Sequence, residues 1–295
     1  MKRILIAIAS GLLWMACGSK SSPMPPVFPN TEEPQDKWTY FDNEIRPATT
    51  LPCFQGAYYR KVVSSKDHWV GIKGEVTLPQ IQFDPDRKNP NRPLQYLDNP
   101  SVYMGGNMDG QETDIGLTWE VIRDVKGVVS QERLAFRPFL RRTTHKSGQP
   151  SLYQNAPAEA AYYWYPGEKV KMSVEVVSEG QLKFVVDGAG KRYETVFESA
   201  GYSLNGIGEF KRVNAIDQVS NEGKPAQATK TTVTGSVWDH TTLVRMEKGQ
   251  KIEAPMHAGR YTSMVCPLAK HFALSQSEED KKLGAESIAI SGAGN

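Results

Sequence analysis

The chain has 295 residues, and its 35 Lys and Arg side chains nearly balance its 33 Asp and Glu side chains. Lys2 and Arg3 are the only charged residues among the first 16, so the remainder carries 33 basic and 33 acidic groups. This balance argues against a nucleic-acid partner, because nucleic-acid binding depends on many phosphate contacts by Lys and Arg. It argues equally against electrostatic adhesion to anionic lipid.

Residues 1–16 have the pattern of an export signal. Lys2 and Arg3 precede an apolar run from Ile4 to Met15 that is too short to span a bilayer, and the small residue Ala16 stands directly before Cys17. This arrangement resembles the lipobox of bacterial lipoproteins, in which the cysteine is lipidated and becomes the first residue of the mature chain. The resemblance implies a membrane anchor at Cys17. An ordinary secretory signal followed by a chance cysteine is the alternative.

The resemblance also has implications for location. Gly18 follows the cysteine, where an aspartate would indicate retention in an inner membrane. A bacterial cell envelope is therefore the expected location, at the outer membrane if the cell has two membranes, with the domain facing the periplasm or the surface. Residues 17–37 are rich in Pro and Ser and cannot bury enough surface to fold, so they are expected to form a tether.

The two remaining cysteines, Cys53 and Cys266, lie near opposite ends of the part expected to fold. In an exported protein disulfides persist, so a bridge between these two is predicted, with two buried free thiols as the alternative. The bridge would close a loop of about 210 residues, which in the chain-entropy model stabilises by roughly 4 to 5 kcal/mol.

The body of the chain is predicted to consist of strands. Apolar and polar residues alternate over 170–176 and again over 182–186, with a turn at Glu179-Gly180 between them. Residues 114–121 alternate as well, residues 134–142 form a strand interrupted by Pro138, and residues 229–246 suggest two short strands. The pattern over residues 58–83 favours strands as well. We expect one all-β domain over 38–273, in two packed antiparallel sheets, followed by a polar, mobile tail over 274–295 with a helical turn or two from Glu278 to Leu283.

Four segments carry a family resemblance. They read "DIGLTWEV", "AFRPFLR", "YYWYPGEKVKMSVEV" and "GQLKFVVDG", within residues 103–245. Together they resemble the core of the concanavalin A-like lectin and glucanase sandwiches. The resemblance implies a two-sheet antiparallel β-sandwich of the jelly-roll type. It does not by itself assign an activity.

Glucanases of the concanavalin A-like group carry the motif Glu-x-Asp-x-Glu, or a form of it one residue longer, on one strand. This chain has Glu112 and Asp114, but the third acidic position holds Gly116, and the longer form would place it at Leu117. Glu120 lies eight residues beyond Glu112, about 27 Å along an extended strand, so the two cannot serve one glycosidic bond. A non-catalytic protein is therefore the favoured prediction. If it is an enzyme, a glycoside hydrolase using Glu112 and Asp114 is the first hypothesis.

No cofactor is predicted. Asn107 and Asp109, near Glu112 and Asp114, offer oxygen ligands suited to Ca²⁺, but the loop lacks the first and the closing ligand of an EF-hand. Calcium therefore stays a weak candidate at this position.

Glycan binding is the leading functional hypothesis. Exposed aromatic rings stack on sugars while neighbouring polar groups bind the hydroxyls. The residues predicted to do so are Tyr162, Trp164, Asp114, Arg137, Asn214 and Asp217. The alternative for the aromatic residues is packing in the core. The competing functions are a structural or protein-binding envelope lipoprotein without sugar affinity, and a glycoside hydrolase.

Overall fold

The computed structural model describes residues 38–123, 129–143 and 149–294. The predicted signal peptide (1–16), the tether (17–37) and the lipidation site Cys17 lie outside the described residues. In the described part of the chain, no helix is long and apolar enough to cross a membrane.

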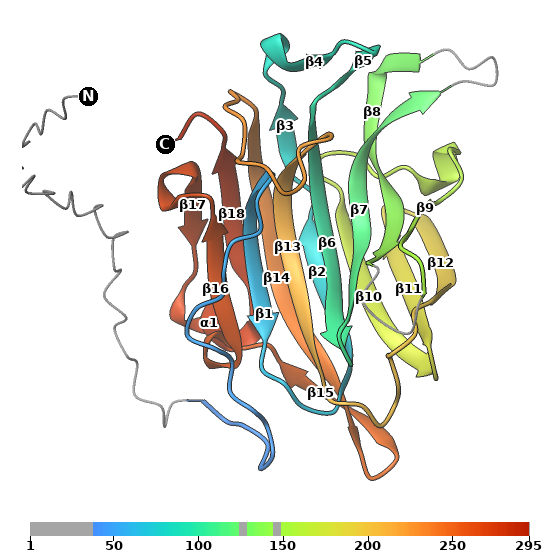
Figure 1. Cartoon of the computed structure of the whole chain (residues 1–295), viewed down its shortest axis with the longest axis vertical. Coiled ribbons are helices and arrows are strands. Elements are labelled where there is room, and N and C mark those ends of the chain that lie inside the picture. The colour runs from blue at the N-terminus through green and yellow to red at the C-terminus, as the bar shows by residue number, and fades with distance from the viewer. Residues whose placement is uncertain (1–37, 124–128, 144–148, 295) are drawn as a thin grey trace, which may run out of the picture. The chain divides into compact units, whose positions relative to one another are not determined.

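Two large antiparallel sheets make up the fold, one in front of the other in Figure 1. The seven-stranded sheet, which faces the viewer there, has the order β16-β1-β13-β6-β7-β8-β9. Its strands span Tyr261–Cys266 (β16), Ala57–Ser64 (β1), Gly208–Gln218 (β13), Asp98–Met108 (β6), Gln111–Arg123 (β7), Val129–Arg142 (β8) and Leu152–Asn155 (β9).

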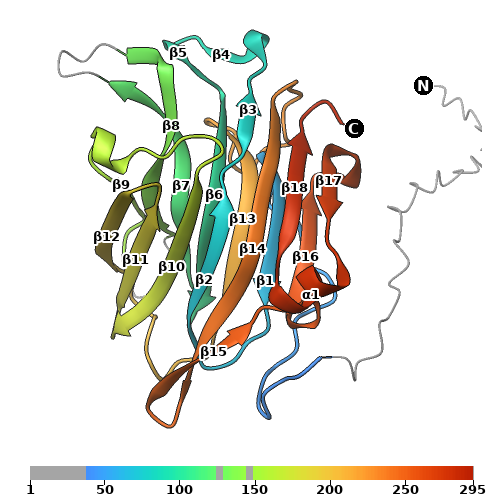
Figure 2. The ribbon, with the colours of Figure 1, turned by 180° about the vertical axis from the view of Figure 1, so that it is seen from behind.

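The second sheet, in front in Figure 2, has nine strands. Its path is β12 (Lys191–Glu198), β11 (Gln181–Gly188), β10 (Lys169–Ser178), β2 (Trp69–Thr77), β14 (Thr232–Glu247), β18 (Glu286–Ser291) and β17 (Phe272–Ser275). Strands β15 (Gln250–Pro255) and β3 (Gln80–Gln82) also pair with β14, and a small hairpin joins β4 (Lys88–Asn89) to β5 (Arg92–Tyr96). The helical elements are α1 (Glu278–Leu283) and four 3₁₀ turns at Pro85–Arg87, Ala160–Tyr162, Ala258–Arg260 and Ala269–His271.

The core lies between the sheets, and period-two alternation creates it. In β10, Val170, Met172, Val174 and Val176 point inward and pack with the inward rows of β2 and β11. Trp69, Trp164 and Trp238 are among the largest side chains that are fully buried. The predicted all-β antiparallel sandwich is confirmed, as is the predicted turn at Glu179-Gly180, where Gly180 has a positive φ.

Two sequence-based predictions about elements were wrong. Residues 229–246 do not give two short strands, because the 16-residue strand β14 runs through them with register shifts that keep it paired to β2 and β18. The polar tail over 274–295 is also part of the fold. The predicted helical turns form α1, capped by Ser277, but β18 then inserts between β14 and β17 and buries Ile288 and Ile290. The compact unit that begins at Trp38 therefore includes the segment after residue 273 as well.

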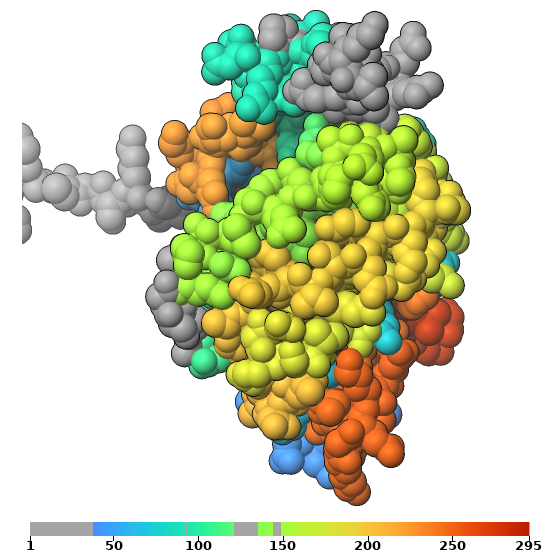
Figure 3. All heavy atoms as spheres, turned by 90° about the vertical axis from the view of Figure 1, so that its right-hand side faces the viewer, coloured from blue at the N-terminus to red at the C-terminus, as the bar shows by residue number. Residues whose placement is uncertain are grey.

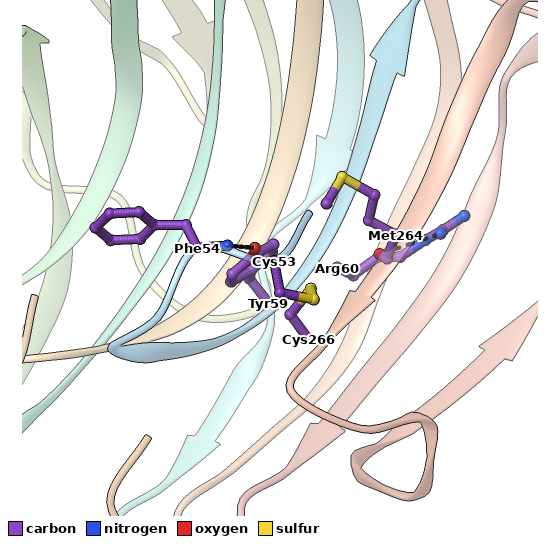
Figure 4. The surroundings of a disulfide bond; sticks show 6 residues. All are labelled: Cys53, Phe54, Tyr59, Arg60, Met264 and Cys266. Carbon is purple, nitrogen blue, oxygen red and sulfur yellow. Dashed lines mark hydrogen bonds between the residues drawn. A yellow bond between two sulfur atoms is a disulfide. The ribbon is translucent and has the colours of Figure 1, made fainter. Parts of the chain in front are cut away.

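The predicted disulfide between Cys53 and Cys266 is present, with the two Cα atoms 5.9 Å apart. As Figure 4 shows, it joins the segment before β1 to the end of β16. The backbone N–H of Phe54 donates a hydrogen bond of 2.7 Å to the hydroxyl of Tyr59. The segment leading into β1 is thus fixed to the seven-stranded sheet at two successive residues.

Candidate functional site

A groove of about 700 Å³ lies on the outer face of the seven-stranded sheet, the face turned away from the core. We call it the sheet groove. Its lining comes from six strands and the segments beside them: Phe54, Gln55, Gly56, Ala57, Tyr59, Lys61, Asn99, Tyr103, Glu112, Asp114, Thr118, Phe139, Arg141, Thr143, Ser151, Tyr153, Lys211, Asp217, Gln218 and Glu222.

Strand pairing explains why these residues share a face. On β7, Ile115 and Leu117 point into the core, so Glu112, Asp114 and Thr118 point outward. The register then places Asp114 opposite Gly105 of β6 and Arg141 of β8, and it places Lys211 of β13 opposite Gly105 from the other side. Residues from four strands therefore form one row across the groove.

Two glycines near this row lie where a side chain would collide with a neighbouring strand. A Cβ atom on Gly116 would lie 2.4 Å from the Cα of Tyr103, and one on Gly105 would lie 1.9 Å from the carbonyl oxygen of Thr113. The absence of a side chain at Gly105 therefore lets β6 approach β7 closely here, and Lys211 contacts Asp114 across this position. Gly116 stands where the glucanase pattern has its third acid. Because it has no side chain, Tyr103 can lie directly against β7 at this position.

Lys211 forms an ion pair with each of the two acids first considered for catalysis. Its Nζ lies 2.7 Å from Oδ1 of Asp114 and also contacts Oε1 of Glu112. Burial by itself would lower the pKa of Lys211, but Asp114 and Glu112 outweigh it and raise the pKa above its ordinary value. The lysine therefore stays charged. Glu112 and Asp114 share this one cation on the floor of the groove.

A third carboxyl group, that of Asp217 on β13, enters the groove from another strand. Burial raises the pKa of Asp217 to about 6, against a hydrogen bond from the hydroxyl of Ser101 that lowers it. The negative charge of Asp114 raises this pKa further, whereas Arg141 lowers it. The groove thus holds one carboxyl group that gains or loses its proton near pH 6.

Aromatic rings line the groove over its whole width. Phe54, beside β1, and Tyr153, on β9, are 53% and 54% exposed and come from opposite sides of the sheet. Phe139 is buried between Tyr153, with the ring centroids 6.0 Å apart, and Tyr103, with the centroids 5.7 Å apart. Burial keeps the pKa of Tyr103 well above its ordinary value, so its phenol is neutral and can donate a hydrogen bond.

The structure brings together some of the residues predicted to bind a ligand. Asp114 and Asp217 line the sheet groove with Glu112. Arg137 is on the same face of the sheet, opposite Thr118, and its guanidinium lies 2.5 Å from Oε2 of Glu120.

Trp164, Tyr162 and Asn214 do not lie in this groove. Trp164 is fully buried and its indole N–H donates 3.0 Å to the carbonyl oxygen of Gly188, so the prediction that it stacks on a sugar was wrong. Tyr162 packs against the core, edge-on to Tyr193. Asn214 is buried between the sheets, where it accepts from the indole N–H of Trp238 and donates to Ser236. Tyr162 and Trp164 therefore pack in or against the core, which was the alternative stated for them.

The two weak calcium candidates belong to different elements. Asn107 is on β6 opposite Glu112, whereas Asp109 lies in the following turn with a φ of 51°. Within residues 38–123, 129–143 and 149–294, no group of three or more His, Cys, Asp or Glu side chains could hold a metal ion.

Phe54, Tyr103, Tyr153 and Lys211 were not among the residues predicted to bind a ligand. The outward orientation of Tyr103 could have been predicted, because it alternates with the apolar residues Val102 and Met104 on one strand. Lys211 gave a weaker signal, as one charged residue in a mixed segment. Nothing local indicated that Phe54 and Tyr153, 99 residues apart, line the same groove.

Comparisons with known proteins find no relative by sequence and only weakly similar solved structures. No family model matches the chain, and no curated protein sequence matches it. Among solved structures, a scytalido-glutamic peptidase with a transition-state analogue inhibitor is similar at 8% identity and a TM-score of 0.47, over 81% of this chain and 100% of that chain. An alginate lyase, Aly36B, in complex with alginate tetrasaccharide is similar at 11% identity and a TM-score of 0.38, over 66% and 78%. A GH16 protein of Bacteroides ovatus is similar at 9% identity and a TM-score of 0.35, over 66% and 83%. Likenesses of this size carry no argument about function.

Proposed function

We propose that the sheet groove binds a glycan. The observation that carries this proposal is that two exposed rings, Phe54 and Tyr153, line a groove with hydrogen-bonding side chains between them. Aromatic rings provide an apolar surface for the C–H faces of a sugar, and a few well-placed polar groups fix its orientation. Asn99, Thr118 and Gln218 supply neutral polar groups in the same lining.

The polar groups of the groove are held in place before any ligand arrives. Lys211 fixes Asp114, Ser101 fixes Asp217, and Arg141 lies 2.5 Å from Oε1 of Glu222. Side chains that are already ordered lose less conformational entropy on binding, which favours affinity. This order also supports glycan binding over a purely structural role, because a structural surface has no need of a concave, hydrogen-bonded lining.

Glycan binding can be tested with a glycan array followed by calorimetry on the full-length chain. We expect Phe54→Ala and Tyr153→Ala each to lower the affinity for the bound glycan at least tenfold, because each removes one stacking surface. Val196→Ala is the matched control: Val196 is 53% exposed on β12 of the other sheet, and the change should leave affinity unaltered. Absence of binding to any glycan, or wild-type affinity in both aromatic variants, would contradict the proposal and favour the structural or protein-binding alternative.

A hydrolytic function is the second candidate, and Asp217 is the observation in its favour. A carboxyl group with a pKa of about 6 can donate a proton at moderately acidic pH, and it shares the groove with Glu112 and Asp114. The same glycans should therefore be assayed for release of reducing ends. Release that Asp217→Asn or Glu112→Gln abolishes would replace the binding proposal by a glycoside hydrolase.

The lipid anchor at Cys17 is a further part of the proposed function. The lipobox-like sequence supports it, and several acyl chains make a lasting anchor where a single chain does not. The anchor would hold the groove at the cell envelope. We expect the wild-type protein, expressed in a bacterium, to fractionate with membranes and Cys17→Ser to be released into the soluble fraction. Equal fractionation of the two proteins would show that Cys17 carries no anchor.

A further inference from the structure

A second cavity, of about 460 Å³, adjoins the sheet groove beneath the β4–β5 hairpin, and we call it the hairpin cavity. Its lining comprises Asn89, Asn91, Arg92, Leu94, Gln95, Tyr96, Asp98, Asn99, Thr118, Trp119, Glu120, Tyr153 and Val219. Three of these residues, Asn99, Thr118 and Tyr153, also line the sheet groove. The two cavities are therefore contiguous. Figure 3 shows the hairpin (teal) projecting at the top of the molecule, above the edge formed by β9 to β12.

We propose that the hairpin cavity is a second subsite of the same groove, and that the ligand is an uncharged polysaccharide chain occupying both. This inference rests on the proposed glycan binding and adds the size and charge class of the ligand. It is supported by the continuity of the two cavities, by the aromatic lining of the second one, and by the ion pairs that engage most of the charged side chains along both.

The aromatic residues that line the hairpin cavity pack against further rings. Tyr96 on β5 stacks on Phe83, with ring centroids 4.2 Å apart and planes 6° apart. Phe83 also contacts Trp119 on β7, with centroids 5.5 Å apart, and Trp119 lies edge-on to the buried ring of Phe136. Each ring that lines the cavity is thus fixed by another ring behind it. A fixed aromatic surface can stack on a sugar without losing side-chain entropy.

The dimensions favour a chain over a single sugar. Glu112 lines the sheet groove and Glu120 lines the hairpin cavity, and both belong to β7. Eight residues of an extended strand span about 27 Å. This length exceeds a single sugar ring several times, so one monosaccharide would leave most of the lining without a contact.

Most charged side chains along the groove have an ionic partner, which favours an uncharged ligand, and Lys61 and Arg92 add two further cations to the lining. Lys211 is paired with Glu112 and Asp114, Arg141 with Glu222, and Arg137, beside the junction of the two cavities, with Glu120. Asp98, at the back of the hairpin cavity, accepts hydrogen bonds from Arg87, Thr229 and Thr231. An ionic group on the ligand would have to compete with these existing partners. Hydroxyl groups need only hydrogen bonds. At the junction Asn99 donates to the hydroxyl oxygen of Thr118, so the amide oxygen of Asn99 can accept from a sugar and the Thr118 hydroxyl can donate to one.

The experiment is calorimetry of the full-length chain with uncharged gluco-, xylo- and manno-oligosaccharides of two to eight units. The wild-type protein should bind six units of the preferred sugar at least tenfold more tightly than two units. Tyr96→Ala removes the ring on the hairpin, so it should reduce this advantage to less than threefold while leaving the affinity for two units unchanged. Leu94→Asp, at an exposed position of the same cavity, should act in the same direction without disturbing the aromatic stack.

Leu274→Asp is the matched control, because Leu94 is 41% exposed and Leu274, on β17 of the other sheet, is 40% exposed. This variant should keep the wild-type dependence on chain length. Equal affinity for two and six units, or an undiminished advantage in both hairpin variants, would overturn the second subsite and leave the glycan-binding proposal intact. Preference for sulfated or uronic-acid oligosaccharides over uncharged ones would overturn the charge class. No binding at any length would contradict both proposals.

Discussion

Replacing Cys53 and Cys266 together by serine should destabilise the protein by about 5 kcal/mol, because the bridge closes a loop with a sequence separation of 213 residues. For a domain of this size that corresponds to a fall in the midpoint of thermal unfolding of roughly 10 to 20 °C. The change can be measured by following circular dichroism during heating, with and without a reductant. The reductant should lower the midpoint of the wild-type protein and leave that of the double variant unchanged.

The same variant should also bind glycan more weakly, because Phe54 follows Cys53 directly and lines the sheet groove. Binding has to be measured well below the unfolding midpoint of the variant, so that only the folded protein is compared. A midpoint within about 3 °C of the wild type would show that the bridge constrains the unfolded chain far less than its loop length implies.

Glu286→Gln should be the most damaging single substitution among those considered, at about 3 to 5 kcal/mol. Glu286 of β18 is buried between the sheets, and its carboxylate lies 2.7 Å from Arg60 of β1 and 3.2 Å from Arg212 of β13. Removing its charge would leave two buried guanidinium groups without a counter-charge, while the volume of the side chain stays the same. Urea unfolding measures the loss of stability.

Glu253→Gln is the control for this substitution, because Glu253 forms a comparable 2.8 Å pair with Lys73 but its side chain is 57% exposed. Exposed pairs contribute about 0 to 1 kcal/mol, so stability should hardly change. Equal effects of the two variants would show that the cluster around Glu286 is hydrated in solution.

The cluster also predicts how stability depends on pH. Burial by itself would raise the pKa of Glu286, but Arg212 and Arg60 outweigh it and hold the pKa below its ordinary value of 4.5. A carboxyl group with a lowered pKa in the folded state stabilises the fold above its unfolded pKa and loses this contribution as the pH falls through the folded value. The wild type should therefore lose stability below about pH 4.5, and Glu286→Gln should lose less over the same range.

Local patterns were sufficient to predict the class of the fold. The alternation over 170–176 and 182–186 identified β10, β11 and the turn between them, because side-chain period and turn chemistry are properties of a few consecutive residues. The disulfide followed from the number of cysteines and the expected compartment. The glycine at position 116 showed that the glucanase pattern lacks its third acid, and the structure adds that a side chain there would collide with Tyr103.

The binding face could not be predicted in this way. A strand in a sandwich has two faces. Alternation shows that one face is apolar and the other polar, but it does not show which other strands lie beside that strand. Trp164 was expected on a surface, but its isolated bridge to Phe136 and its contact with Gly188 place it in the core. Likewise the residues of β18 were predicted to belong to a polar tail. Their apolar side chains are buried only because β18 pairs with β14 and β17.

The sequence by itself therefore determined the all-β class, the strands β10 and β11 with the turn between them, the pairing of the cysteines and the absence of a glucanase motif on β7. Only the tertiary structure decided that Asp114, Asp217, Lys211, Phe54 and Tyr153 share one groove. The physical reason is the range of the interactions. Alternation and turn formation act between neighbours in the chain, whereas the register of β13 on β6 and of β6 on β7 brings together residues as far apart as Asp114 and Lys211.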